Sequence, residues 1–150
     1  MENNSAMQEN NSAMQENNAV QEDRIILELE KENEQYMMDL RETLNLSFKV
    51  LHAMEEKDYA LLESLSSSDI SLDKKDNQVV YFVGEQEIRM NFLTGIHLGN
   101  LEYRGGGYSD NNSGFQIYLA HYFEDTHGTI YFDFIKKNDR WLFNGFMTNA

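Results

Sequence analysis

The sequence predicts an α+β protein in which N-terminal helices pack on a strongly curved antiparallel sheet. Between residues 37 and 54 apolar side chains recur every three or four positions, which is typical of a helix with one buried face. The last third holds four runs rich in Tyr, Phe, Ile and Trp, separated by short polar turns, as in consecutive antiparallel strands. At 150 residues and 41% hydrophobic composition, one domain with its own core is expected.

Residues 1–20 are a slipped repeat with a period of seven, built on Met-Gln-Glu-Asn-Asn-Ser-Ala. Seven is also the period of a coiled coil, but each repeat offers only one Met and one Ala, beside two Asn that form helices poorly. Such a segment buries too little apolar surface to offset the entropy of ordering it. We therefore expect a disordered low-complexity tail, followed by a single domain over residues 21–150.

The helical part begins at about residue 21. No Gly or Pro interrupts residues 22–57, which favours one long helix or two nearly continuous ones. We expect Leu44, Phe48 and Leu51 to face the sheet, because they share the apolar stripe. Asp58 is a predicted N-cap of a second, short helix. The residues of the stripe are Met37, Leu40, Leu44, Phe48 and Leu51. Upstream of it, in the same long helix or in a separate first one, lie the apolar residues Ile25, Ile26, Leu27 and Leu29.

A small hairpin and a third helix are predicted next. Residues 70–73 and 78–83 flank a polar turn and are interpreted as two paired strands. Residues 85–93 carry apolar side chains at helical spacing and precede Gly95, so they predict a short helix closed by that glycine.

The four final strands are predicted over residues 101–108, 115–124, 129–137 and 141–147, with turns at 110–113, 125–128 and 138–139. These turn lengths imply a register. In it Leu119 lies opposite Phe134, and His121 lies opposite Phe132. Across the last turn, Phe134 lies opposite Phe143 and Phe132 opposite Gly145. The resulting apolar face is expected to pack on the long helix.

The opposite face of the predicted sheet is unusually aromatic for a surface in contact with water. Asp133 falls on this face, where a hydrogen-bonded interface carboxylate is favoured over a catalytic one. Either another subunit or another segment of the same chain, such as residues 25–29, is expected to cover the face. We predict a homodimer formed through it, with an interface made by Tyr118, Tyr122, Tyr131, Leu142 and Phe146.

Three consecutive glycines interrupt the first of these strands at residues 105–107. They are typical of a bulge or sharp bend, or alternatively of a backbone that approaches a ligand closely. A hairpin follows them rather than a helix N-terminus, so the structural interpretation is favoured over an anion cradle.

His121 is the strongest single candidate for chemistry, because a titratable ring continues the apolar row of its strand. We predict that it lies on a pocket wall and binds a ligand together with Tyr108 and Arg104, without catalysis. A histidine satisfied at the edge of the core is the alternative. The predicted register puts no Asp–His or Asp–Tyr set on one face, and no zinc-ligand spacing or cofactor motif stands out, so no catalytic residue, metal or cofactor is predicted.

In this order the elements resemble the nuclear transport factor 2-like (cystatin-like α+β cone) superfamily, over roughly residues 36–150. The residues that carry the resemblance are Phe48, Leu51 and Met54 running into Lys57, Asp58, Tyr59, Leu62 and Leu65, and at the other end Tyr131, Phe132, Phe134, Lys136 to Trp141, Phe143, Gly145 and Phe146. The resemblance implies a cone that encloses a pocket, and often a dimer made through the outer face of the sheet. Fold alone implies little about activity.

The formal net charge of −14 disfavours nucleic acid and anionic membranes as partners. The expected function is that of a non-catalytic, homodimeric module that binds a small apolar or aromatic molecule or a protein. A small hydratase or isomerase using a His/Tyr pair is the alternative, as is an acidic inhibitor or immunity-type protein. Neither a signal segment nor a membrane span stands out, so a cytoplasmic location is expected, or export if a leader has been removed.

Overall fold

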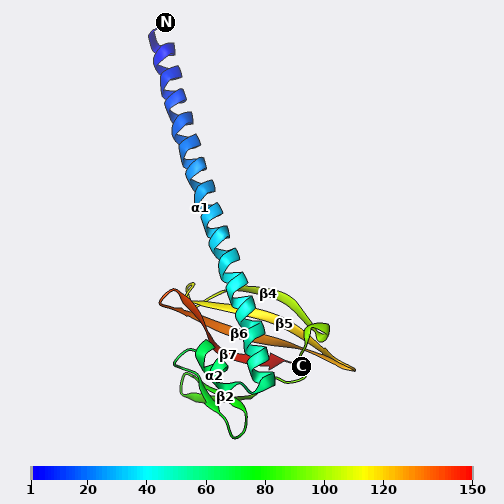
Figure 1. Ribbon diagram of the computed structural model, residues 1–150. Helices are drawn as coiled ribbons and strands as arrows, with labels where there is room; N and C mark the ends of the chain where they lie inside the picture. The colour runs from blue at the N-terminus through cyan, green and yellow to red at the C-terminus, as the bar shows by residue number, and fades with distance from the viewer. Residues whose placement is uncertain (1, 150) are drawn as a thin grey trace. The chain divides into compact units, whose positions relative to one another are not determined.

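The computed structural model describes residues 2–149, with side chains from residue 12 onward, and it confirms the α+β class (Figure 1). The chain forms two compact units, Met1–Met38 and Asp39–Ala150, each of which is described by itself. The elements in order are α1 (Glu2–Glu56), α2 (Tyr59–Leu65), β1 (Ser71–Asp73), β2 (Gln78–Val83), β3 (Gln86–Asn91), the 3-10 helix η1 (Leu98–Asn100), β4 (Leu101–Ser109), β5 (Gly114–Phe123), β6 (Thr126–Lys137) and β7 (Arg140–Asn149).

The first unit consists of the N-terminal part of α1. The helix begins at Glu2 and includes the heptapeptide repeat, where the sequence predicts a disordered tail. Extending an existing helix costs far less than nucleating one, so weak helix formers can continue a helix that stronger residues have started. From residue 12 to residue 35 every side chain is exposed. No helix among the described residues is long and apolar enough to cross a membrane.

In the second unit, the buried stripe of α1 is rotated from the predicted one. Thr43 and Ser47 are fully buried in this stripe, whereas Phe48 is 37% exposed, so the prediction that Phe48 faces the sheet is wrong. The Thr43 hydroxyl donates to the Asp39 carbonyl at 2.7 Å, and the Ser47 hydroxyl donates to the Thr43 carbonyl at 2.9 Å. Because these bonds satisfy both hydroxyls within the helix, small polar residues can occupy the buried face.

The glycine run of β4 allows α1 to pack closely on the sheet. A bulge separates Tyr103 from Gly105 in the pairing with β5, as the bend interpretation predicts. A Cβ added at Gly106 would lie 3.0 Å from the Gln116 carbonyl oxygen and 3.1 Å from Leu40 Cδ1 of α1. The missing side chain therefore lets helix and strand approach each other.

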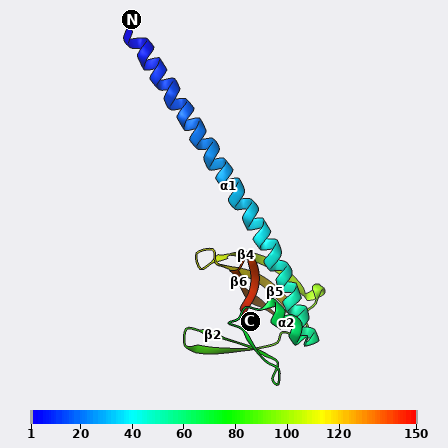
Figure 2. The ribbon, with the colours of Figure 1, turned by 60° about the vertical axis from the view of Figure 1, so that its left-hand side comes forward.

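The segments after α1 form α2 and a three-stranded sheet in the order β1-β2-β3 (Figures 1 and 2). Asp58 caps α2 as predicted, since its carboxylate accepts from the Leu61 backbone N–H at 3.1 Å. The predicted third helix is wrong, because Gln86–Asn91 is strand β3, which pairs with β2. In β3 the half-buried Ile88 and Met90 alternate with exposed residues, which is the period of a strand.

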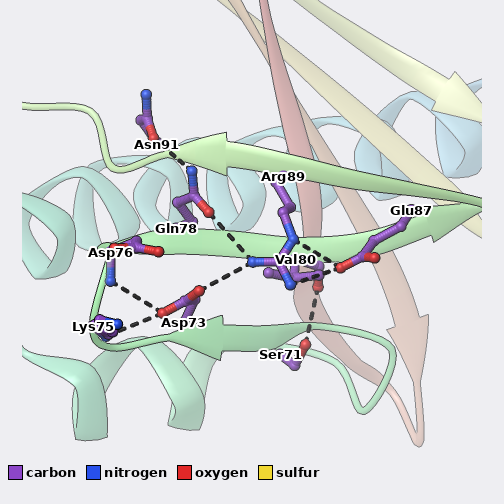
Figure 3. Close-up of polar contacts among 9 residues, drawn as sticks. All are labelled: Ser71, Asp73, Lys75, Asp76, Gln78, Val80, Glu87, Arg89 and Asn91. Atoms are coloured by element: carbon purple, nitrogen blue, oxygen red, sulfur yellow. Dashed lines mark hydrogen bonds and ion pairs between the residues drawn. The ribbon is translucent and has the colours of Figure 1, made fainter.

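Polar contacts tie the strands of this small sheet together (Figure 3). Arg89 of β3 donates to Asp73 of β1 at 3.0 Å and pairs with Glu87 at 2.8 Å. Gln78 of β2 donates to Asn91 of β3 at 2.9 Å. The charge of Arg89 is thus matched within its own sheet.

The four-stranded sheet has the order β4-β5-β6-β7, as a consecutive meander requires. Two predicted turns are confirmed: the four-residue turn at 110–113, since Ser109 pairs with Gly114, and the two-residue turn at 138–139, since Lys137 pairs with Arg140. The middle turn has two residues rather than four, because Phe123 pairs with Thr126. The predicted partners on β6 are therefore shifted by four, and Leu119 lies opposite Ile130. Because the shift is even, the side chains of β5 and β6 stay on their predicted faces.

One face of this sheet, here called the inner face, holds a dry aromatic core. The ring of Phe132 lies about equally close to the rings of Phe143 and Phe146, with both centroid separations 6.0 Å. The cone shape that the family resemblance implies stays a prediction. The fully or almost fully buried members of this face are Phe115, Ile117, Leu119, Ile130, Phe132, Phe134, Phe143 and Phe146.

A bulge in β7 places Phe146 on the inner face. Asn144 and Gly145 together oppose Asp133 of β6, so Phe132 pairs with Phe146 instead of Gly145. Gly145 has φ +123°, a conformation that L side chains rarely adopt, and a Cβ there would lie 3.1 Å from the Tyr81 ring. The assignment of Phe146 to a dimer interface is therefore wrong: Phe146 is fully buried within its own chain.

Candidate functional site

The most promising concavity lies where the end of β2 meets the outer face of the four-stranded sheet, opposite the aromatic core. Contacts between β2 and β7 bring the two sheets together here. The cavity, of about 230 Å³, is called the Asp133 hollow. Its lining includes Tyr81, Phe82, Asp110, Gln116, Asp133 and Asn144.

Two aromatic residues of β2 line the hollow, one of them buried and hydrogen-bonded and the other exposed. Tyr81 is buried, and its hydroxyl donates to the Phe146 carbonyl at 2.7 Å, so its ring is fixed against the β7 bulge. Phe82, the next residue of β2, is 65% exposed. The hollow therefore has a fixed aromatic wall and an exposed aromatic rim.

Asp133 is the central titratable group. Burial raises the pKa of its carboxyl, and the nearby charge of Asp110 raises it further, against the opposing effect of a hydrogen bond from Gln116. Gln116 Nε2 donates to Asp133 at 2.7 Å, while the Tyr118 hydroxyl donates to Gln116 Oε1 at 2.8 Å. This chain of donors fixes the Asp133 carboxylate on the outer face.

A second hollow of about 370 Å³ adjoins the first and shares Tyr81, Phe82 and Asn144 with it. It adds Asp69, which forms an ion pair with Lys137 at 3.8 Å. Among the described residues that line the two hollows there are three carboxylates and no Lys or Arg.

This arrangement suits a ligand that donates hydrogen bonds and carries positive charge. Carboxylates accept up to two donors on each oxygen, and aromatic faces attract cations such as guanidinium groups. In the part of the chain that the structure describes, no three His, Cys, Asp or Glu side chains converge on a metal-sized site.

The three residues predicted to bind a ligand are not brought together. Tyr108 pairs with Phe115, whereas His121 lies six residues further along β5, a separation of ~20 Å in a strand. The Tyr108 hydroxyl donates to the Asp39 carboxylate of α1. Arg104 instead contacts the Tyr122 hydroxyl and pairs with Glu102 at 3.1 Å. A single pocket formed by His121, Tyr108 and Arg104 is thus contradicted.

His121 lies at the hairpin end of β5, half-buried beside Gly128. Its Nδ1 atom is buried and has no hydrogen-bond partner among the described residues, and burial lowers the pKa of the imidazole. A Cβ added at Gly128 would lie 2.7 Å from His121 Nε2, so the ring is closely packed. The close packing agrees with a core-edge position for His121, but the hydrogen bond that the alternative interpretation expects is not found at Nδ1 within the described part of the chain.

The remaining residues of the predicted dimer interface share the outer face. The Tyr118 and Tyr131 rings meet edge to face with centroids 5.4 Å apart, and both side chains are half-buried, as is Leu142. Tyr122 is 37% exposed and stacks on His127. An interface through these four residues stays a prediction.

Sequence reasoning missed a buried polar cluster centred on Asp39 of α1. This carboxylate is almost fully buried and accepts from Trp141 Nε1 at 2.9 Å and from the Tyr108 hydroxyl, with Lys136 Nζ at 3.7 Å. The only local signal is an acidic residue beside the apolar stripe, and such residues are usually solvated. Because its partners come from three different strands, the cluster fixes the helix to the sheet.

Comparison of this chain with protein-family models, with curated proteins and with solved structures finds no match. Its candidate function therefore rests on the residues and geometry above.

Proposed function

We propose that this protein is a non-catalytic binding module, whose Asp133 hollow receives a cationic side chain of a protein or peptide partner. The observation that carries the proposal is a cavity with an aromatic wall and several carboxylates, lined by no Lys or Arg among the described residues. The raised pKa of Asp133 supports the proposal. Burial disfavours the ionised carboxylate, so a cation that binds beside it stabilises that charged form. The overall charge of −14 would attract a basic partner over longer distances.

This proposal replaces the small apolar or aromatic ligand that the sequence favours. The middle of the inner face, where the predicted cone would hold such a ligand, is filled by the Phe132, Phe143 and Phe146 rings. The relationship to the nuclear transport factor 2-like superfamily stays part of the proposal. It is supported by the order of a long helix, a short helix, a hairpin and a four-stranded meander.

Catalysis in the hollow is less well supported than binding. A hydratase or isomerase would need an acid beside Asp133 as its base. Tyr81 is the nearby phenol, but its hydroxyl already donates to the Phe146 carbonyl. The homodimer likewise stays a proposal, now restricted to Tyr118, Tyr122, Tyr131 and Leu142, and its test is the oligomeric state in solution.

The test is a titration of the labelled protein with a short peptide that carries one Arg, monitored by backbone amide shifts. The control ligand is the same peptide with citrulline, which keeps the shape of the side chain without its charge. We expect the Arg peptide to shift the amides around residues 110, 116 and 133, and to bind at least about tenfold more tightly than the citrulline peptide.

Two variants locate this binding. Asp133→Asn keeps the shape and the acceptor for Gln116, and it should abolish the preference for Arg. Asp125→Asn makes the same charge change in the exposed β5–β6 turn, outside the hollow, and should leave the preference intact. Equal binding of the two peptides, or an equal effect of the two variants, would refute the proposal. Affinity should increase as the pH rises through the raised pKa of Asp133, because the cation requires the ionised carboxylate.

A further inference from the structure

The first unit exposes an apolar patch on α1 that is separate from the hollow. Ile25, Ile26 and Leu29 are 52–58% exposed, although side chains of this kind are usually buried. At about 100° per residue, the three side chains fall on one side of the helix, because they are spaced by three and four residues. The patch corresponds to adjoining a, d and g positions of a heptad, in which Ile26 is at a and Leu29 at d.

Charge is distributed unevenly around this patch. Glu22 lies on the same side, one turn before Ile26. Asp23 and Glu30 border one flank, and Glu28 and Glu32 border the other. The two basic residues of the segment, Arg24 and Lys31, are seven residues apart and lie on the opposite side of the helix, together with Leu27. The apolar patch is thus edged by carboxylates, and the basic residues point away from it.

The acidic borders of the patch determine which kind of partner helix can pack on it. Residues 1–35 carry nine acidic and two basic side chains, a formal charge of −7. A second copy would bring two such segments together and place carboxylate flanks near carboxylate flanks. A helix with Lys or Arg beside its apolar seam would instead cover the Ile and Leu side chains and pair with both flanks.

We infer that α1, through Ile25, Ile26 and Leu29 and their acidic borders, docks a basic amphipathic helix of a partner protein. This surface is independent of the Asp133 hollow, since it lies in the other unit and uses other residues. The heptapeptide repeat contributes no further Leu, Ile or Val to the seam, so the docking surface begins near residue 22.

The test uses the full chain and a fluorescent synthetic peptide of about four heptads, with Leu at a and d and Lys at e and g. The control peptide has Glu in place of each Lys. Fluorescence anisotropy should show the Lys peptide binding at least about tenfold more tightly than the Glu peptide, and less tightly as salt is added. Equal affinity for the two peptides would overturn the inference.

Matched variants locate the surface. The double change Ile26→Ser and Leu29→Ser should weaken binding of the Lys peptide by at least about tenfold. Leu27→Ser removes an equally exposed apolar side chain from the opposite side, and should change the affinity by less than about twofold. The double change Asp23→Lys and Glu30→Lys should lower the preference for Lys over Glu peptide. Far-ultraviolet circular dichroism checks that each variant keeps its helix.

Three outcomes would contradict this assignment. If Leu27→Ser weakens binding as much as the double change does, the contact is not made by this side of the helix. If only Asp133→Asn weakens binding, the peptide occupies the hollow, and the two proposals are thereby distinguished. If the unmodified chain sediments as a dimer that Ile26→Ser and Leu29→Ser dissociate, the occupant is a second copy.

Discussion

The two faces of the four-stranded sheet use alternate residues of the same strands but have opposite character. On the inner face, Phe132 and Phe143 are fully buried among other aromatic rings. On the outer face, Gln116, Tyr118 and Asp133 are half-buried and linked by hydrogen bonds. A closely packed aromatic cluster is stabilised by its own contacts, whereas a polar and partly covered face can keep carboxylates at a cavity. The difference shows that the packing of the inner face stabilises the fold, and it is the reason why the proposed binding site lies on the outer face.

The largest expected effect is the loss of an inner aromatic ring. Phe143→Ala should lower the free energy of unfolding by ~3–5 kcal/mol, because it leaves a cavity in a packed core. Urea denaturation measures this effect. Phe82→Ala, on the exposed rim of the hollow, is the control and should cost less than ~1 kcal/mol. Similar losses for both would mean that the faces do not differ in packing as described.

Removal of the buried carboxylate should have the next largest effect. Asp39→Ala leaves the Trp141 N–H and the Tyr108 hydroxyl without their acceptor and is expected to cost ~2–4 kcal/mol in urea denaturation. Asp39→Asn retains an acceptor oxygen and should cost less. If the alanine variant were as stable as the parent, the cluster would not fix α1 to the sheet.

The smallest expected effect concerns the outer face and depends on pH. The pKa of Asp133 is raised above its ordinary value of 3.8, so the folded state binds this proton more tightly than the unfolded state does. The carboxyl therefore favours folding below pH 3.8, and this contribution is lost as the pH rises through the folded-state pKa. At pH 7, Asp133→Asn should have a higher melting temperature than the parent, and the difference should shrink toward pH 4. Asp125→Asn should show no such trend, and a pH-independent difference for Asp133→Asn would contradict the raised pKa.

Local sequence determined several features correctly. The Asp58 cap and the turns at 110–113 and 138–139 follow from side chains that accept backbone hydrogen bonds or tolerate positive φ, as Asn138 (φ +51°) and Asp139 (φ +60°) do. The faces of β5 follow from strict alternation. These features depend only on residues close together in the chain, so the sequence alone is sufficient to predict them.

Other features were decided by tertiary structure. Residues 86–91 have helical spacing but form β3, because β2 offers a strand edge with which to pair. The rotation of α1 depends on partners about seventy and a hundred residues away, Tyr108 and Trp141, which hold Asp39 on the buried side in place of Phe48. The β7 bulge places Phe146 instead of Gly145 opposite Phe132. The Tyr81 ring packs against Gly145 and forms the wall of the Asp133 hollow. Local patterns determine the period of each element, whereas the packing of side chains distant in the sequence determines its register and rotation. The candidate site depends on that register, so the sequence alone does not predict it.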